Sequence, residues 1–298
     1  MARQYKIHTN LDGTDDKVWD VTNGKVRFYQ PSNLGLQSTN NIWQSNGIGI
    51  MGTRSITQPQ IEFKLETFGE SLEENYRLMK DFINDILNKK FVTLEYQTEI
   101  FQVYADLALA EVTKTEGYGK NGTFSEKITF DIITKWYTYE NLTFDMIKNG
   151  EVIAGKSKIY GGTAPGSYKY VEGVSYTYYG ETNIERLSRW DIKDEIFSFM
   201  GILYPQLPKT PTGVRFLDDI GNEYTAIVFK TEELQDYILI NTDVNDETYQ
   251  GWKGTTALNL FPVMDFERYR TRIIEKGQME LINLSKAEFK IKRKADFV

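Results

Sequence analysis

Apolar and polar positions alternate along most of the chain, and this alternation predicts a protein built mainly of β-strands. Between residues 61 and 66, Ile61, Phe63 and Leu65 alternate with charged residues, which predicts a strand with one face in water. Similar patterns predict strands at 92–96, 101–112, 128–132, 225–230, 237–241, 269–275, 278–283 and 288–292. Asn23-Gly24 predicts the turn of a hairpin over 18–29, and Lys276-Gly277 predicts a turn between 269–275 and 278–283.

Two segments have apolar residues at helical spacing instead. Ser71 and Glu74 have the spacing of a capping box, which predicts a helix over 71–88. Its apolar face contains Leu72, Tyr76, Met79, Phe82, Ile83, Ile86 and Leu87. We expect that face to cover the adjacent sheet, although it would also suit a partner helix. A second, shorter helix is predicted from Ser188 to about Gly201, with the following residues buried: Ile192, Ile196, Phe197 and Met200.

The composition changes after Trp136–Tyr139, and we expect two β-domains, 1–138 and 139–298. Within the second, residues 159–180 contain six tyrosines and five glycines and almost no aliphatic residues. Such a segment has little with which to build a core of its own. Two interpretations stay open from the pattern alone. The segment is either a projecting loop or hairpin that grips another protein, or a surface excursion packed on its own domain.

Composition excludes several kinds of chemistry. The 298-residue chain is 40% hydrophobic and is therefore large and apolar enough to fold without disulfides or metal. It has no cysteine and one histidine, His8, which excludes thiol nucleophiles, cysteine-ligated zinc, iron–sulfur clusters and sites with several imidazoles. Its net charge of −7 argues against duplex binding. We expect no cofactor, no metal and no membrane insertion.

Carboxylates are the remaining candidates for catalysis. The densest groups are Asp218-Asp219 and the loop with Asp243, Asp246 and Glu247. Paired acids can cleave a glycosidic bond when they face each other across a cleft. Adjacent acids between strands are more often turn formers, so we assign no catalytic residue.

Other motif matches fail on their context. A calcium loop that starts at Asp243 would need Gly and Glu where the chain has Thr248 and Gly254. Residues 47–52 have the spacing GxGxxG, but no helix is predicted after them, as a dinucleotide site requires. The basic tail 286–294 is interpreted as an edge strand whose lysines discourage pairing.

Long stretches of the chain, more than any short motif, resemble the distal tail proteins of lactococcal siphophages of the skunavirus type. They include RQYKIHTNLDGTDDKVWDVTNGKVRFYQPSNLGLQ, FGESLEENYRLMKDFINDI, the Tyr/Gly segment and the final GWKGTTALNLFPVMDFERYRTRIIEKGQMELINLSKAEFKIKRKADFV. The resemblance covers essentially the whole sequence.

The resemblance implies a hexameric ring that acts as the hub of the baseplate beneath the tail tube. It implies an N-terminal β-sandwich with a helix, which builds the ring and its DNA channel, and a galectin-like C-terminal β-sandwich. An arm inserted at about 145–185 would hold trimers of the receptor-binding protein. The tyrosines implied to bind this partner are Tyr160, Tyr168, Tyr170, Tyr176, Tyr178 and Tyr179.

An alternative from another class is a carbohydrate-binding module for host cell-wall saccharide. In that hypothesis an exposed Trp252 would stack on a pyranose ring. A hydrolase that uses Asp218 or Asp243 is a further, weaker alternative.

Overall fold

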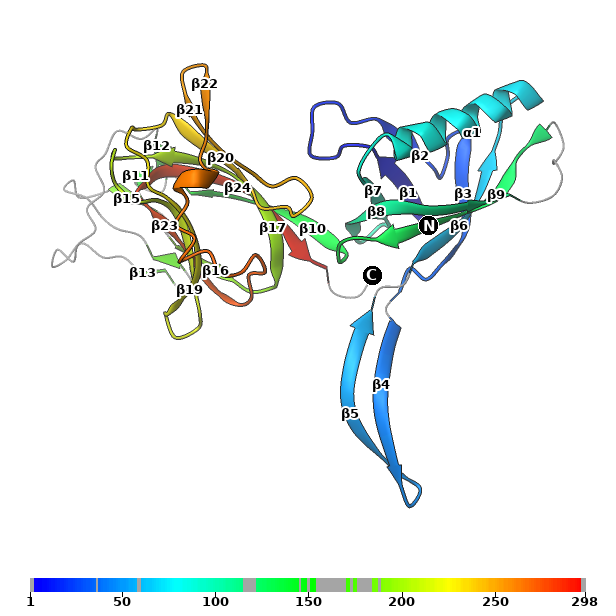
Figure 1. Cartoon of the computed structure of the whole chain (residues 1–298), viewed down its shortest axis with the longest axis horizontal. Coiled ribbons are helices and arrows are strands. Elements are labelled where there is room, and N and C mark those ends of the chain that lie inside the picture. The colour runs from blue at the N-terminus through cyan, green and yellow to red at the C-terminus, as the bar shows by residue number, and fades with distance from the viewer. Residues whose placement is uncertain are drawn as a thin grey trace. The chain divides into compact units, whose positions relative to one another are not determined.

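The computed structural model is mainly β-structure, as the alternation predicts (Figure 1). It describes residues 3–35, 37–57, 60–114, 122–144, 146–148, 151–153, 170–171, 174–175, 184–186 and 189–295. The chain divides into two compact units. Unit 1 comprises Met1–Thr138 with Ala295–Val298, and unit 2 comprises Tyr139–Lys294. In the described part of the chain, no helix has the length and apolarity of a membrane span.

Unit 1 has one long antiparallel sheet and a helix. Its elements are β1 (Gln4–His8), β2 (Val18–Asp20), β3 (Val26–Ser32), β4 (Gln37–Ser45), β5 (Ile48–Thr57), β6 (Ile61–Thr67), α1 (Leu72–Leu87), β7 (Val92–Gln97), β8 (Gln102–Thr113) and β9 (Ser125–Ile132). The strand order is β2-β1-β7-β8-β9-β6-β3, while β4 and β5 form a separate sheet. The Tyr5 ring on β1 lies 5.5 Å from that of Phe63 on β6. Because these strands are not neighbours in the sheet, the sheet folds over and encloses a core.

The predicted helix is present as α1, with Ser71 as its N-cap. The Ser71 hydroxyl accepts a hydrogen bond from the backbone N–H of Glu74 at 3.2 Å. Phe82 and Ile86 are buried in the core of unit 1, so α1 covers the sheet. The predicted apolar face is partly wrong, because Leu72, Tyr76 and Leu87 are more than half exposed.

Asn75 occupies the buried position on the first turns of α1 that those residues were expected to fill. Its side-chain oxygen accepts from the Gly69 N–H at 2.6 Å, and its amide donates to the Ser71 carbonyl at 3.0 Å. These hydrogen bonds satisfy a buried amide and tie the preceding loop to the helix. The buried stripe therefore passes through Asn75 and leaves Leu72 and Tyr76 in solvent.

The hairpin predicted at Asn23-Gly24 is wrong. The chain does turn there, since Gly24 N–H donates to the Asp20 carbonyl at 2.9 Å. However, β2 pairs with β1 and β3 pairs with β6, so the two strands around the turn do not form a ladder with each other. Neither Asn23 nor Gly24 has the positive φ of a tight hairpin turn.

Unit 2 is a two-layer sandwich with additional short strands. Its elements are β10 (Tyr137–Phe144, which begins at the end of unit 1), β11 (Met146–Lys148), β12 (Glu151–Ile153), β13 (Tyr170–Val171), β14 (Val174–Ser175), β15 (Ile184–Arg186), β16 (Arg189–Ile192), β17 (Ile196–Pro205), β18 (Thr212–Leu217), β19 (Glu223–Phe229), β20 (Tyr237–Asn241), β21 (Thr248–Lys253), β22 (Thr256–Asn259), the 3₁₀ turn η2 (Phe261–Val263), β23 (Gly277–Ile282) and β24 (Leu284–Lys294). One layer has the order β10-β24-β17-β20-β21-β22 and the other β16-β23-β18-β19. Phe199 of the first layer and Phe216 of the second pack against each other in the core, with their ring centroids 5.8 Å apart.

The second predicted helix, from Ser188 to Gly201, is wrong. The residues from 189 onward form β16 and β17. β17 pairs with β20 and β24, which satisfies its backbone on both sides. Gly201 lies where a β-carbon would come within 2.9 Å of Ile240 and Phe289, so it permits close packing in the sheet.

Three predictions near the C-terminus are also wrong. Residues 269–275 are not a strand; Ile274 makes only an isolated bridge to Ile196. Lys276-Gly277 is therefore not the turn of a hairpin, because no strand precedes it and Gly277 itself begins β23. Gly277 has a φ of 145°, and a β-carbon there would collide with the Leu217 carbonyl. The basic tail is not an edge strand, because β24 lies between β10 and β17.

Candidate interaction surfaces

The tyrosines that we predict to bind a partner lie in the Tyr/Gly segment, residues 159–180. Tyr160, Tyr168, Tyr176, Tyr178 and Tyr179 lie outside the described residues. Tyr170 begins β13, whose backbone pairs with β14 through Tyr170 and Ser175. Their role in binding a partner stays a prediction.

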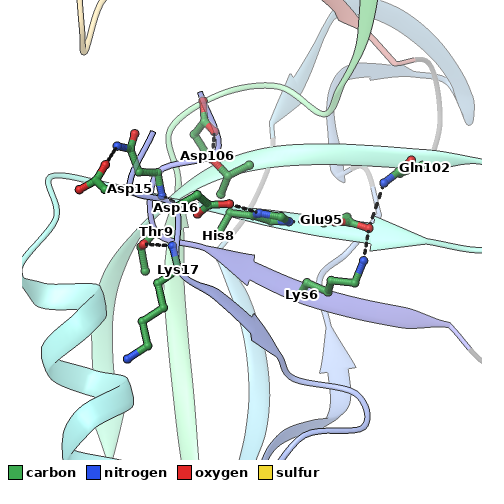
Figure 2. A network of polar contacts seen from close by, with 11 residues as sticks. Lys6, His8, Thr9, Asp15, Asp16, Lys17, Glu95, Gln102 and Asp106 are labelled. Carbon is green, nitrogen blue, oxygen red and sulfur yellow. Dashed lines mark hydrogen bonds and ion pairs between the residues drawn. The ribbon is translucent and has the colours of Figure 1, made fainter. Parts of the chain in front are cut away.

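A buried polar network lies beside β1 and β7 in unit 1 (Figure 2). His8 Nδ1 is 2.6 Å from Asp16 Oδ2, and His8 Nε2 is 2.8 Å from Glu95 Oε2. Lys6 Nζ and Gln102 Nε2 both approach Glu95 Oε1, at 3.0 and 2.9 Å. Each nitrogen of the His8 ring therefore faces a carboxylate, and Glu95 is contacted at both of its carboxylate oxygens.

This network determines the ionisation of Glu95. Burial by itself raises the pKa of Glu95, but hydrogen bonds from His8 and Lys6 outweigh it and hold that pKa below its usual value of 4.5. The sequence did not reveal this, because the alternation in 92–96 predicts that Glu95 faces water. In the structure Thr93 and Glu95 are buried, and the network satisfies their polar groups. We interpret the network as a tie that fixes the loop 9–17 to β1 and β7.

The acidic side chains of the loop 243–247 in unit 2 form ion pairs and hydrogen bonds with other residues of the same chain. Asp243 pairs with Lys292 at 2.8 Å, and both side chains are buried. Glu247 pairs with Arg272 at 2.6 Å and accepts from the Tyr249 hydroxyl at 2.7 Å. Among the described residues, no group of three or more acids and histidines is arranged to hold a metal ion. Every one of these loop contacts is structural.

The Asp218-Asp219 pair is part of a turn. Asp218 Oδ1 accepts hydrogen bonds from the backbone N–H groups of Ile220 and Asn222, at 3.1 and 2.8 Å. Gly221 supplies the positive φ of 88° that this turn requires. The side chain therefore shapes the connection between β18 and β19.

Trp252 does not have the exposed ring that a saccharide platform requires. Its ring stacks on that of Tyr237, with centroids 6.0 Å apart and planes 15° from parallel. Its side chain is half-buried, and its Nε1 atom is buried without a hydrogen-bond partner. Stacking on Tyr237 occupies one face of the indole, so the carbohydrate alternative loses its main residue.

Unit 2 has an open groove of about 540 Å³ on one of its sheets. Its lining includes the apolar Met200, Ile202 and Leu239 and the polar Asn141, Asn241 and Glu288. Phe289 also lines it but is only 3% exposed. Among the lining residues that the structure describes, no exposed aromatic ring is available to stack on a sugar.

The hairpin of β4 and β5 is a surface that the sequence analysis missed. Figure 1 shows it as a long two-stranded ribbon that extends away from the sheet of unit 1. Asn46 and Gly47 form its turn with φ angles of 50° and 77°, the backbone required of a tight hairpin. This Asn-Gly dipeptide was the available signal. The GxGxxG spacing of residues 47–52, by contrast, does not indicate a hairpin.

The chain matches known proteins over its whole length. The family model described as "Distal tail protein, N-terminal domain" matches residues 4–133, and "Dit, C-terminal domain" matches 135–298. The chain is 93% identical to the distal tail protein of Lactococcus phage p2 and 91% identical to that of Lactococcus phage SK1, over 100% of each chain.

Solved structures give the same result for the fold. A chain in the structure of the phage P2 baseplate in its activated conformation with Ca matches with a TM-score of 0.81 and 93% identity, over 100% of both chains. The SPP1 Dit protein matches with a TM-score of 0.53 at 10% identity, over 98% of this chain and 99% of that one. At that identity the likeness concerns the fold alone.

Proposed function

The chain belongs to the distal tail protein family, and from this membership we propose that it forms a hexameric hub ring at the distal end of a siphophage tail. In this proposal the ring joins the tail tube to the baseplate and holds trimers of the receptor-binding protein. The chain is a structural protein of the phage baseplate, and its family is not known to be enzymatic.

The observation that carries the proposal is the 93% identity over the full chain to a phage distal tail protein. Physical features of the described residues support it. The acids that sequence reasoning singled out as catalytic candidates are engaged in turns and ion pairs. The net charge of −7 suits a subunit that borders a channel for DNA, because an acidic surface repels phosphate.

The ring is assigned to the N-terminal domain, and the grip on the receptor-binding protein to the arm at 145–185. Aromatic side chains supply large contact area at low entropic cost, which suits a gripping segment rich in tyrosine. A ring of identical subunits requires that one surface of each copy meets a different surface of the next. We also propose that the C-terminal domain is a galectin-like β-sandwich.

Absolute mass in solution tests the ring. We expect light scattering to give about six times 34.6 kDa, with added mass when receptor-binding protein is present. A chain that stays monomeric at every concentration and ignores that partner would overturn the proposal.

Deletion of residues 145–185 separates the two parts of the proposal. We expect the shortened chain to keep the mass of the ring and to lose the receptor-binding protein. Capture of that partner by the deletion variant would remove the arm from the proposal and leave the ring intact. A glycan array with the full chain checks the saccharide alternative, and binding that Trp252→Ala abolishes would favour it.

A further inference from the structure

One sheet edge of unit 2 is left open by the described part of the chain. β22 is the last strand of the layer β10-β24-β17-β20-β21-β22, and within the described residues it pairs only with β21 (Figure 1). All of its residues, 256–259, are exposed. They include neither a charged residue nor a proline, which natural proteins commonly place on a strand edge to prevent pairing with another chain.

The second layer of unit 2 ends differently, because its edge strand β19 is covered by the segment that follows β22. The Asp265 N–H donates to the Val228 carbonyl at 2.8 Å, and the Ala226 N–H donates to the Arg268 carbonyl at 2.9 Å. The chain therefore satisfies the backbone of one edge with its own residues. The edge at β22 has no such cover among the described residues.

The register of the β21–β22 hairpin shows which backbone groups are available. The Trp252 carbonyl accepts from the Asp236 N–H at 2.7 Å, so the backbone of Trp252 points toward β20 and away from β22. Ala257 lies opposite Trp252 in the ladder, and its N–H and C=O therefore point outward. Backbone direction alternates along a strand, so the same holds for Asn259. These outward groups can accept another strand.

Exposed apolar side chains lie beside this edge. Leu258, Phe261 and Phe266 are 50%, 45% and 50% exposed. The rings of Phe261 and Phe266 pack edge to face with centroids 5.1 Å apart, and Phe261 also stacks on the buried Tyr249 at 6.0 Å. The aromatic pair is thus held in place before any partner arrives, which lowers the entropic cost of binding.

Negative charge predominates at both ends of β22. Glu233 and Asp236 contact the β21–β22 turn, while Asp265 and Glu267 flank Phe266 in the sequence. One acid at each end pairs with a lysine, so an excess of negative charge remains. A second copy of this chain, with a net charge of −7, is poorly matched to such a surface. A strand of a different protein with basic flanking residues is well matched.

We propose that the open edge of β22 binds an extended segment of the receptor-binding protein by strand addition. This inference rests on the proposed function. The backbone of Ala257 and Asn259 would pair with that segment, and its apolar side chains would pack beside Leu258 and Phe266. Such a segment carries alternating apolar residues and basic residues at its ends.

The choice of this partner follows from where the arm is inserted. The proposed arm, 145–185, lies within the residue range of unit 2, which also contains β22. A partner held by the arm stays tethered to unit 2 at a high effective concentration, so the contact at a short edge strand adds to affinity although it is weak alone. The edge is therefore a second contact that orients the receptor-binding protein on unit 2.

A proline on the edge tests the proposal with the full chain. Ala257→Pro removes an outward N–H and leaves the hydrogen bonds to β21 intact. We expect binding of the receptor-binding protein to weaken at least about 10-fold in calorimetry, because a backbone hydrogen bond is lost and the proline ring blocks the edge. The matched control is Asp219→Pro, at the second position of the exposed turn closed by Asp218 and Gly221, where proline is favoured.

The control should bind the receptor-binding protein like the unmodified chain. If Ala257→Pro also binds like the unmodified chain, the edge is wrong while the arm proposal stands. If the unmodified chain does not bind the receptor-binding protein, both proposals are overturned.

Photo-crosslinking gives a readout that does not depend on a proline in β22. A photoreactive phenylalanine analogue at position 266 should yield a product with the mass of this chain plus one subunit of the receptor-binding protein. The same analogue at position 220, where Ile220 is 83% exposed, is the control and should give no such product. A cross-link from position 266 to a second copy alone, or no cross-link, would overturn the edge.

Discussion

Two parts of unit 1 differ in how they use apolar side chains. In the folded sheet, Phe63 and Leu65 are essentially inaccessible to water and pack under α1. In the β4–β5 hairpin, Trp43 and Ile50 are more than 60% exposed. Burial is what makes an apolar residue stabilise its own fold, so the first set stabilises the unit. The second set is exposed and therefore available to another molecule.

The largest expected effect is in the core. Phe63 is 1% exposed, and its ring packs against those of Phe28 and Tyr5. The ring centroids lie 4.7 Å and 5.5 Å away, respectively. Phe63→Ala should lower the free energy of unfolding of unit 1 by about 3–5 kcal/mol, because it leaves a cavity. Urea unfolding measures this loss, with Ile50→Ala as the exposed control. If Phe63→Ala and Ile50→Ala lowered the free energy of unfolding equally, the difference between the buried core and the exposed hairpin would be contradicted.

A buried charge pair in unit 2 should have a similar, slightly smaller effect. Lys292→Met leaves the buried Asp243 without its cation and should cost about 3 kcal/mol in the free energy of unfolding. The double variant Lys292→Met/Asp243→Leu should recover much of that loss. The control is Lys253→Met, whose partner Glu233 is exposed, and it should not measurably change stability. If the double variant were as unstable as Lys292→Met alone, the unpaired Asp243 carboxylate would not be the cause of the loss.

The His8 network should make stability depend on pH. Because the folded pKa of Glu95 lies below 4.5, its stabilising contribution is present above about pH 4.5 and is lost as the pH falls through the folded pKa. Glu95→Gln should cost about 1–3 kcal/mol at pH 7. The difference in unfolding free energy from the unmodified chain should shrink below pH 4.5. A difference that stays constant with pH would show that Glu95 is not ionised there.

The smallest expected effect is at the hairpin tip. Trp43→Ser should change the unfolding free energy of the chain by less than about 0.5 kcal/mol in dilute solution, because the side chain is two-thirds exposed. Chemical denaturation at low protein concentration measures it. A loss comparable to that of Phe63→Ala would mean that Trp43 belongs to a core, and it would remove the contrast between the two regions.

Two Asn-Gly dipeptides show how far local sequence can predict this fold. Asn46-Gly47 makes a tight hairpin turn with both φ angles positive. Asn23-Gly24 has the same two residues between alternating runs, yet β2 and β3 pair with different strands. The dipeptide permits a hairpin, and the pairing of distant strands decides whether one forms. The local sequence predicts a hairpin at Asn23-Gly24, whereas the structure has one at Asn46-Gly47.

Segments with a strong and unambiguous period were predicted well. β6 alternates between buried and half-exposed residues along its whole length, as the pattern 61–66 predicts. α1 begins at Leu72 after the predicted Ser71 cap. The short apolar run 192–200 fits both a helix and a strand, and pairing with β20 and β24 made it a strand.

The sequence by itself determined the mainly β fold, the position of α1 and the family, because these depend on periodicity and on long stretches of residue identity. Only the tertiary structure decided that Glu95 is buried, that β24 is an inner strand, and that the hairpin of residues 37–57 stands in solvent. Each of these depends on which strands meet across many residues of intervening chain. Local patterns of polarity do not encode that pairing, since the same residues satisfy more than one partner.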